Sequence, residues 1–399
     1  MKRVKKENDP QIRDDITSMV DLPRDLIEKI LLKLPAKSVP KLIVVSKLWS
    51  SIIRSKSFID LYLKRSLTRP CFLITFNRDD IRFFHSIYQQ SLEAASPSSS
   101  YTSTISSFPL SLDRKRLFSQ SYNVSPPVRG LICFQDLDKV VVSNLSTGQF
   151  LVLPKVRKLG ISWFLGYDPV GDEYKVLCTT VVFQVSGAVV SEEHQVFTLK
   201  GGSQKKEKEE ATWRMIECKF PHCPATKGIC MTTTTTGVVY YGALSTRDRD
   251  TRESLIVSFD VRSEGFTLVK LPNGVEIDGG ESAELVNYQG KIALLNHLHF
   301  GKCNMWVLED IGVKPEWSKI SIVVPSWADL ARRRLLDCRG AILSSGKFIF
   351  SPVSSDSPFC IVTYDREKDI GRRVEIEGLG DNLRSVSLFL DHVECPIFL

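Results

Sequence analysis

The residues whose types could support catalysis or metal binding are few and scattered. The chain has 10 cysteines and 6 histidines, but it contains no GxxxxGK[ST] phosphate loop, no HExxH zinc helix and no GxSxG nucleophile elbow. The closest group of metal-binding residue types is Cys218, His222, Cys223 and Cys230. Because this group lacks the second, distant pair that zinc sites usually have, the sequence favours buried or edge thiols. We expect neither a metal nor a cofactor.

Two further histidines, His297 and His299, flank Leu298. On a strand their side chains would share a face, a spacing that can ligate a metal once a third partner is present. The sequence supplies no such partner nearby. An active site would therefore need serine, aspartate and histidine brought together by folding, which no motif suggests. We expect a protein without catalytic residues.

The best candidate for a binding surface in the long C-terminal part is a basic cluster. Trp327 opens a short amphipathic stretch in which Arg332, Arg333 and Arg334 are expected to be exposed together. Such a cluster could contact an acidic partner. A solvated loop or helix face is the alternative interpretation. Core packing is expected for three other tryptophans in or beside strands, Trp213, Trp306 and Trp317.

Positive charge is concentrated at the N-terminus. Residues 1–66 hold 15 Lys and Arg against 8 Asp and Glu, and the remaining 38 and 38 cancel, which gives the net charge of +7. A neutral body argues against nucleic-acid binding, because such binding depends on concentrated positive charge. The basic start, with Lys2, Arg3, Lys5 and Lys6, fits either a nuclear import signal or a solvated tail.

The sequence also excludes two locations for the protein. No stretch approaches the roughly 18 consecutive apolar residues that span a bilayer, and the polar N-terminus does not look like a signal peptide. Scattered single cysteines are typical of a reducing compartment. We expect no membrane association and a location inside the cell, in the nucleus, the cytoplasm or both.

The elements that must position these surfaces begin with short helices. LPRDLIEKILLKLP predicts a helix that starts near Pro23 and ends before Pro35. Ser38, Ser46 and Ser57 are candidate N-caps of the segments that follow. Three or four such helices cannot bury all their apolar side chains alone, which predicts a docking surface for a partner. Packing onto the body as an ordinary cap is the alternative.

The run LPRDLIEKILLKLPAKSVPKLIVVSKLWSSIIRSKSFIDLYLKRS resembles a plant-type F-box over its whole length, including the initial LP, ILLKLP, KSV and VSKLWSSII. The resemblance implies an F-box over residues 19–66, after a basic flexible tail over residues 1–18. It also implies partners, a Skp-type adaptor and through it a cullin. The residues that would bind the adaptor, or shape the surface that binds it, are Leu22, Pro23, Ile30, Leu31, Leu34, Pro35, Val39, Leu42, Val45 and Trp49.

The remainder has short alternating apolar segments separated by turn residues, which is typical of an all-β fold. A loose repeat runs through it, in which a strand ends in Asn or Asp before a turn and a second strand. Steps of 55, 61, 50 and 55 residues separate the repeat marks, Asn144, Leu199, Asp260, Asp310 and Asp365. This period matches a four-stranded blade, and the sequence predicts a kelch-like β-propeller of about six blades. The sixth blade would join the C-terminal SVSLFLDH to the strands near residue 70, which closes the ring.

The segments RGLICF, SNLSTGQFLVLP, FLGYDPVGDEYKVLC and NYQGKIALL resemble the plant F-box-associated interaction domain, here residues 67–399. Together the resemblances imply the substrate-recognition subunit of a Skp-cullin-F-box ubiquitin ligase, which is not itself an enzyme. A non-degradative interaction scaffold is the alternative. Two polar stretches, residues 96–107 and 201–211, are interpreted as exposed loops.

Overall fold

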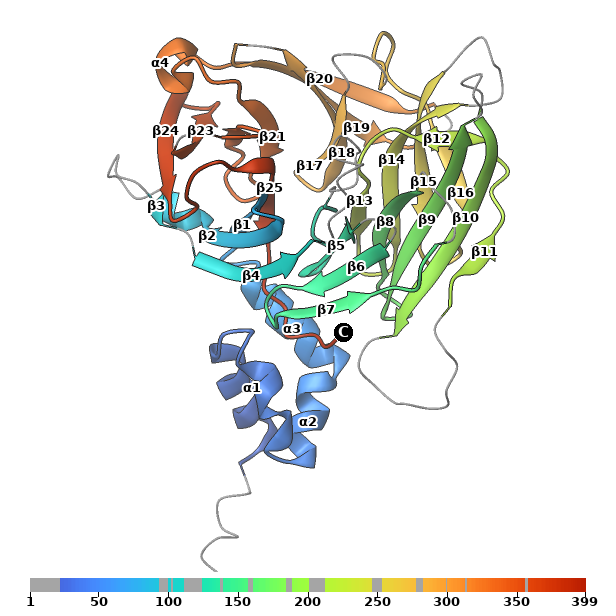
Figure 1. Cartoon of the computed structure of the whole chain (residues 1–399), viewed down its shortest axis with the longest axis vertical. Helices are drawn as coiled ribbons and strands as arrows, with labels where there is room; N and C mark the ends of the chain where they lie inside the picture. The colour runs from blue at the N-terminus through green and yellow to red at the C-terminus, as the bar shows by residue number, and fades with distance from the viewer. Residues whose placement is uncertain are drawn as a thin grey trace, which may run out of the picture.

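The computed structural model describes residues 22–92, 100–101, 103–110, 124–136, 139–156, 161–183, 189–200, 212–245, 253–277, 283–298, 300–312, 314–355 and 358–399. The predicted N-terminal tail and the stretch 201–211 lie outside these residues. The described part consists of a small helical module joined to a ring of β-sheets (Figure 1).

The module contains four short helices: α1 (Arg24–Lys33), the 3₁₀-helix η3 (Val39–Val44), α2 (Lys47–Arg54) and α3 (Lys56–Ser66). Two serines cap them, since the Ser46 hydroxyl accepts the Trp49 N–H at 3.2 Å and the Ser55 hydroxyl accepts the Phe58 N–H at 3.3 Å. The prediction of Ser57 as the last cap is wrong. The chain is extended at Ser55, which is the N-cap, so α3 begins at Lys56.

Six sheets form the ring, and each is one blade of the propeller. Blade 1 contains β25 (Arg384–His392), β1 (Cys71–Arg78), β2 (Ile81–Tyr88) and β4 (Ser103–Pro109). Blade 2 contains β5 (Leu131–Asp136), β6 (Lys139–Asn144) and β7 (Gln149–Val152). Blade 3 contains β8 (Ile161–Asp168), β9 (Glu173–Phe183), β10 (Val189–Lys200) and β11 (Arg214–Ile216).

The second half of the ring follows the same plan. Blade 4 contains β12 (His222–Pro224), β13 (Ile229–Thr232), β14 (Gly237–Ser245), β15 (Ser254–Asp260) and β16 (Phe266–Val269). Blade 5 contains β17 (Glu284–Tyr288), β18 (Lys291–Leu298), β19 (Lys302–Asp310) and β20 (Glu316–Val323). Blade 6 contains β21 (Asp337–Ala341), β22 (Phe348–Ser351), β23 (Phe359–Asp365), β24 (Ile370–Glu377) and β3 (Ser100–Tyr101).

The predicted six-bladed propeller and its closure are confirmed. The C-terminal strand β25 pairs antiparallel with β1, so the two ends of the β region share blade 1. The repeat marks have a structural meaning, because Asn144, Asp260, Asp310 and Asp365 are the last residues of β6, β15, β19 and β23, and Leu199 is the penultimate residue of β10. In the chain each of these strands is followed by the next strand outward in its blade, which is the outermost one except in blade 6, where β3 lies outside β24.

The stretch 96–107 differs from its prediction as a loop. Its described part supplies β3, which pairs parallel with β24, and most of β4, which pairs with β2. Serine and threonine alternate there with few apolar residues, and an outer strand of a propeller tolerates such a composition because only one of its edges is paired.

Apolar side chains fill the boundaries between neighbouring blades. Phe164 of blade 3 stacks on Tyr241 of blade 4, with ring centroids 4.2 Å apart, and Met305 of blade 5 lies in one buried cluster with Phe350 of blade 6. Large residues on strands of facing sheets are what hold a propeller closed. In the part of the chain that the structure describes, no helix is long and apolar enough to cross a membrane.

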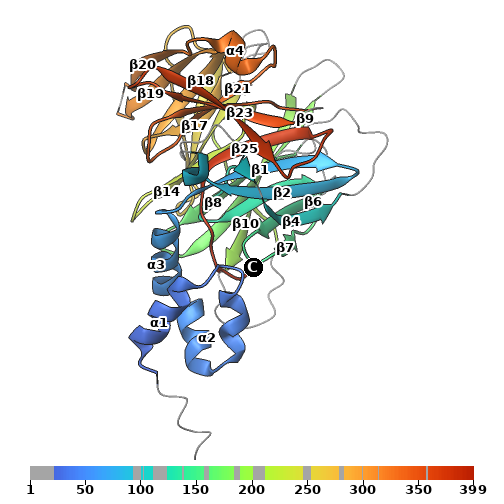
Figure 2. The ribbon, with the colours of Figure 1, turned by 90° about the vertical axis from the view of Figure 1, so that its left-hand side faces the viewer.

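The antiparallel order of the strands divides the connections between two faces of the ring. In the four-stranded blades, turns from the first to the second strand and from the third to the fourth lie on the face next to the helical module, which we call the near face. The β6–β7 turn of the three-stranded blade 2 lies there too, since Asn144 before it binds the C-terminal tail. Loops from the second to the third strand, and the links between blades, lie on the opposite face, which we call the far face. Helix α4 (Trp327–Ala331) lies in the link from blade 5 to blade 6. Figure 1 and, turned by 90°, Figure 2 show it at the opposite end of the molecule from α1 and α2.

Candidate functional site

Helix α1 carries a row of apolar side chains that face solvent. Leu22, Leu26 and Ile30 follow one another at four-residue intervals, and they are 40%, 43% and 37% exposed. Ile27 and Leu31 on the other side of the helix are buried in the module's core. Because residues four apart share a helix face, Leu26 and Ile30 form one apolar row, and Leu22 lies directly before the helix N-cap, Pro23. We call these three exposed residues the α1 stripe.

A second group of exposed apolar residues lies where η3 meets α2. Val44 is 84% exposed, Val45 is 54% exposed and Leu48 is 42% exposed. One exposed valine or leucine is ordinary on a protein surface, but six exposed aliphatic residues within 27 residues of a small module are characteristic of a docking surface. Leu26, Val44 and Leu48 were not among the predicted adaptor-binding residues. The spacing of apolar residues does not reveal which side of such short helices faces solvent.

The remaining predicted adaptor-binding residues occupy three kinds of environment. Leu31 and Val39 are fully buried. Leu34, Leu42 and Trp49 are partly buried against the same core. Pro23 and Pro35 are exposed at the two ends of α1. The buried residues can act on a partner only by fixing the positions of the helices that carry the exposed ones.

The core of the module is completed by the C-terminus of the propeller. After β25 the chain continues into the module, where Val393 and Cys395 are buried among residues of α1, α2 and α3. The Ser66 hydroxyl accepts the Glu394 N–H at 2.8 Å. Asn144 holds the same tail from the other side, since its side-chain amide donates to the carbonyls of Cys395 and Ile397 at 2.9 and 2.8 Å. The last residues of the chain therefore belong to both parts.

Charged groups of α3 also contact the near face of blades 2 and 3. The Lys56 ammonium donates to the Tyr167 hydroxyl at 2.9 Å and lies 3.5 Å from Asp172. Burial lowers the pKa of Lys56, but the hydrogen bond to Tyr167 and the nearby carboxylates raise it by more, so its net shift is upward. Arg129 lies against Asp60 and over the Tyr167 ring, at 4.3 Å from its centroid. The module is thus attached through a buried tail and a partly buried ionic contact.

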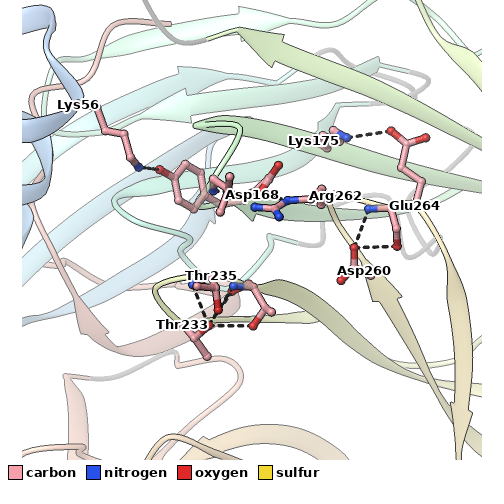
Figure 3. A network of polar contacts seen from close by, with 12 residues as sticks. Lys56, Asp168, Lys175, Thr233, Thr235, Asp260, Arg262 and Glu264 are labelled. Carbon is pink, nitrogen blue, oxygen red and sulfur yellow. Dashed lines mark hydrogen bonds and ion pairs between the residues drawn. The ribbon is translucent and has the colours of Figure 1, made fainter.

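Figure 3 shows that the Lys56 contact lies beside a polar network between blades 3 and 4. Asp168 lies 3.3 Å from the Arg262 guanidinium, and Lys175 donates to Glu264 at 2.9 Å. Burial raises the pKa of Glu264, but the hydrogen bonds from Arg214 and Lys175 lower it by more, so its net shift is downward. These pairs fix the near-face ends of the two blades beside the module.

The far face carries the basic cluster predicted around Trp327. The indole is partly buried and packs edge-on against Phe350, with ring centroids 5.1 Å apart. Arg332 and Arg333 are exposed. Arg334 is half-buried, and its guanidinium donates to the Pro358 carbonyl at 2.6 Å. Arg332 also lies 3.9 Å from Glu375, in an exposed ion pair that a partner could displace. Arg332 and Arg333 thus face solvent on this surface, whereas Arg334 fixes the connection between blades 5 and 6.

Two large apolar residues lie beside these arginines. Leu335 follows directly and is 78% exposed, and Phe300, in the β18–β19 loop, is 80% exposed. The neighbouring Gly301 packs against the Trp327 ring, where a Cβ atom would lie 2.5 Å from the ring carbons. That contact brings the loop and α4 together. We call Phe300, Arg332, Arg333 and Leu335 the far-face patch.

A central channel of about 1040 Å³ runs between the blades. Each blade contributes an inner segment to it, and its described lining includes four charged residues, Lys227, Glu284, Arg339 and Asp391. Burial raises the pKa of Glu284, but the hydrogen bond to His297 and the nearby Arg339 and Lys227 lower it to about 2 overall. Arg339 in turn donates to the Ser351 hydroxyl at 2.9 Å. The described lining combines polar and apolar residues, and its two positive and two negative side chains balance one another.

The cysteines and histidines that the sequence offers as candidate metal ligands do not form one group in the structure. His297 lies 3.9 Å from Glu284, and His299 falls outside the described residues. Cys223 and Cys230 belong to β12 and β13, whereas Cys218 and His222 lie close to His194 of β10. Sequence reasoning did not find His194, because it lies 24 residues before Cys218 and only the packing of blade 3 on blade 4 brings them together.

Comparison with known proteins agrees with both parts of the chain. Residues 19–61 match the F-box domain model, and residues 71–393 match the F-box associated beta propeller domain model. An F-box/kelch-repeat protein of Arabidopsis thaliana is 37% identical over 416 residues, which cover 100% of this chain and 98% of that protein. An Arabidopsis F-box protein is 35% identical over 390 residues, with 94% and 90% coverage, and the Arabidopsis F-box protein DOR is 32% identical over 394 residues, with 94% and 92% coverage.

Proposed function

Because this chain belongs to the F-box proteins that carry an F-box associated β-propeller domain, we propose that it is the target-recognition subunit of a Skp-cullin-F-box ubiquitin ligase. In this role the helical module binds a Skp-type adaptor, and through it a cullin, while the propeller binds the protein to be modified. The observation that carries the proposal is an exposed apolar surface on a module that is fixed to a second, separate binding domain.

The adaptor site consists of the α1 stripe together with Val44, Val45 and Leu48. These side chains leave apolar area in water, and burying it against a partner helix is favourable by roughly 25 cal/mol per Å². The basic residues Lys29, Lys33 and Lys41 are exposed on the same elements. They would attract an acidic adaptor surface and increase its rate of association.

Catalysis in this proposal takes place on another subunit. The protein acts by holding a target near a ubiquitin-loaded enzyme, which raises the effective concentration of the target's lysines. Such an effect requires a fixed distance between the adaptor site and the target site. The shared core at Val393 and Cys395 and the contacts of Lys56 and Arg129 supply that rigidity.

The target site in the proposal is the far face. It points away from the module, so a bound target does not compete with the adaptor for space. Its patch combines Phe300 and Leu335, which are almost fully exposed, with the guanidinium groups of Arg332 and Arg333. Aromatic and arginine side chains are enriched at interface hot spots. This composition fits an acidic peptide segment that has one or two large apolar residues.

The central channel gives no reason to propose an enzymatic activity. Its described lining includes serines but no histidine, so the described lining itself supplies no imidazole as a base for a serine nucleophile. The balanced charges of Glu284, Arg339 and Lys227 serve to hold the inner strands together. An intracellular location, in the nucleus or the cytoplasm, is part of the same proposal, since the other ligase subunits work there.

The proposal is tested by comparing the proteins that co-purify with the wild-type chain and with a Leu26→Asp, Ile30→Asp variant in plant cells. Both substituted positions are solvent-exposed, so the variant should fold. We expect the variant to lose adaptor and cullin while it accumulates bound targets at several-fold higher abundance. A variant that loses the adaptor without any rise in its other partners would instead support a non-degradative scaffold. Binding of adaptor by neither protein would refute the ligase role altogether.

The far-face assignment has its own test. Phe300→Asp and Leu335→Asp should each abolish capture of the accumulated targets while adaptor binding stays unchanged. Val170→Asp, at a similarly exposed apolar position on the near face, is the matched control and should leave target capture intact. Equal loss in all three variants, or in none, would contradict the assignment.

A further inference from the structure

Three potential metal ligands from two blades converge at the boundary between blades 3 and 4. His194 lies on β10, Cys218 follows β11 by two residues, and His222 is the first residue of β12. One nitrogen of each histidine and the Cys218 sulfur all lie within 4.8 Å of one another. Both histidines are buried, and Cys218 is partly buried. From this geometry we infer that His194, Cys218 and His222 form a binding site for one Zn²⁺ ion.

The hydrogen bonds of His222 set the tautomer that metal binding requires. Its Nδ1 lies 2.7 Å from the Phe220 carbonyl oxygen, which can only accept, so Nδ1 carries the proton. Nε2 then carries the lone pair, and the Tyr241 hydroxyl donates to it at 2.8 Å. A histidine whose second nitrogen is held by a backbone carbonyl is the common arrangement around bound metals, because the carbonyl orients the ring and increases its basicity.

His194 supplies an independent observation. The residue is 3% exposed, and within the described part of the chain its Nε2 has no hydrogen-bond partner. An unsatisfied buried nitrogen costs roughly 1–3 kcal/mol, so native proteins seldom leave one without a role. A neutral imidazole with an open lone pair is the form that binds Zn²⁺.

The distances between the three ligands and their chemical types indicate which ion the site would bind. The His194 and His222 ring centroids are 5.1 Å apart, and the Phe266 ring lies 5.0 Å from that of His194. Tetrahedral zinc with bonds of about 2.0 Å to nitrogen and about 2.3 Å to sulfur needs ligand atoms about 3.3–3.7 Å apart. The three residues would therefore move together by about 1 Å on binding. Two imidazoles and one thiolate favour zinc over calcium or magnesium, which prefer oxygen ligands.

The fourth coordination position has a candidate ligand in Tyr241. The Tyr241 hydroxyl lies on His222 Nε2 and would have to leave that nitrogen when a metal takes its lone pair. Tyr241 is completely buried on β14, so its hydroxyl would remain beside the ion, as a ligand or as the partner of a bound water. A buried site of this kind is structural, and it would join blade 3 to blade 4.

The test uses the full-length chain, freed of metal with a chelator and then titrated separately with Zn²⁺ and with Co²⁺ as a spectroscopic probe. Cys218→Ser removes the thiolate at a partly buried position outside the strands. Cys223→Ser is the matched control, because Cys223 is also partly buried and lies five residues away, but is not part of the group. His194→Gln removes the buried ligand that β10 of blade 3 supplies and keeps a polar side chain in the pocket.

We expect wild type and Cys223→Ser to bind one Zn²⁺ per chain, to melt at a higher temperature with zinc than without, and to give a thiolate-to-Co²⁺ charge-transfer band. Cys218→Ser should lose the band, and both it and His194→Gln should bind Zn²⁺ at least tenfold more weakly. Absence of the band in the wild type would overturn the inference whatever the variants do. Equal zinc affinity in Cys218→Ser and Cys223→Ser would overturn it as well.

Discussion

The helical module and the propeller differ in how they bury apolar side chains. Each boundary between blades is filled by residues of the propeller itself, such as Met305 and Phe350 between blades 5 and 6. The module instead completes its core with Val393 and Cys395 from the far end of the chain and leaves Leu22, Leu26 and Ile30 in solvent. The propeller is therefore a self-contained domain, whereas the module depends on the propeller's tail on one side and offers a surface to a partner on the other.

The largest effect that this comparison predicts is the loss of the tail. A chain that ends at His392 lacks Val393 and Cys395, and it leaves the Asn144 amide without its two carbonyl acceptors. Cavity formation and the unsatisfied amide together should cost the module roughly 4 kcal/mol or more. Hydrogen exchange should show amides of α1, α2 and α3 exchanging at least a hundredfold faster. Unchanged protection of these helices, with or without change in blade 5, would mean that the module folds independently.

Substitution of two leucines of α1, Leu26 and Leu31, should change the stability of the module by different amounts. Leu31 is fully buried, so Leu31→Ala should destabilise the module by roughly 2–5 kcal/mol. Leu26 is 43% exposed, so Leu26→Ala should change stability by less than about 0.5 kcal/mol. Hydrogen exchange of the α3 amides measures both variants on the same scale. Similar destabilisation by the two substitutions would contradict the assignment of buried and exposed faces.

The propeller should be sensitive to acid because of two buried histidines. Burial lowers the pKa of His392 to about 4, and burial together with Arg78 lowers that of His85 to about 4. The ordinary value is 6.5, so as the pH falls the unfolded chain takes up protons that the folded chain refuses. Stability that is fully present above pH 6.5 is then lost as the pH falls towards about 4, by up to roughly 3 kcal/mol per histidine.

Denaturant unfolding at a series of pH values measures this loss. His85→Phe should weaken the pH dependence, because the ring packs among Phe76 and Phe83 and the replacement cannot titrate. A propeller whose stability is the same at pH 4.5 and pH 7, or a variant with the full pH dependence of the wild type, would show that these histidines are charged in the folded state.

A smaller effect than the loss of the tail or of Leu31 is predicted for the ionic contact between module and propeller. Asp60 is 42% exposed and pairs with Arg129 and Lys56, so Asp60→Ala should cost no more than about 1 kcal/mol. The change should nevertheless broaden the distribution of distances between spin labels placed on α1 and on blade 5. A distribution as narrow as that of the wild type would show that the buried tail alone fixes the module.

The sequence was most informative where one residue type has one structural use. Prolines 23 and 35 limit α1 because proline cannot continue a helix, and the Asn and Asp residues at the repeat marks end strands because they favour turns. The spacing of these marks predicted the length of one blade. The apolar segments near residue 70 and at the C-terminus predicted that blade 1 closes the ring. Ser55 rather than Ser57 became a cap because two short helices left room for only one extended residue between them.

The sequence was least informative where exposure decides the role of a residue. Leu26 and Leu31 are both leucines of one helix, and only the packing of α3 and the tail determines which of them is free. Phe300 would ordinarily be assigned to a core, yet a tight loop beside Gly301 holds it in solvent. His194 joins Cys218 through contacts between blades, which no local pattern encodes. The fold was therefore accessible from the sequence, while much of the binding surface was not.

The central claim is that the α1 stripe is the adaptor site, and one binding measurement tests it most directly. The affinity of the purified full-length chain for a Skp-type adaptor should fall at least thirtyfold, about 2 kcal/mol, in the Ile30→Asp variant. Leu61→Asp, at an exposed apolar position of α3 outside the stripe, should change the affinity less than about threefold. Equal affinities for Ile30→Asp and the wild type, with both proteins folded, would contradict the account.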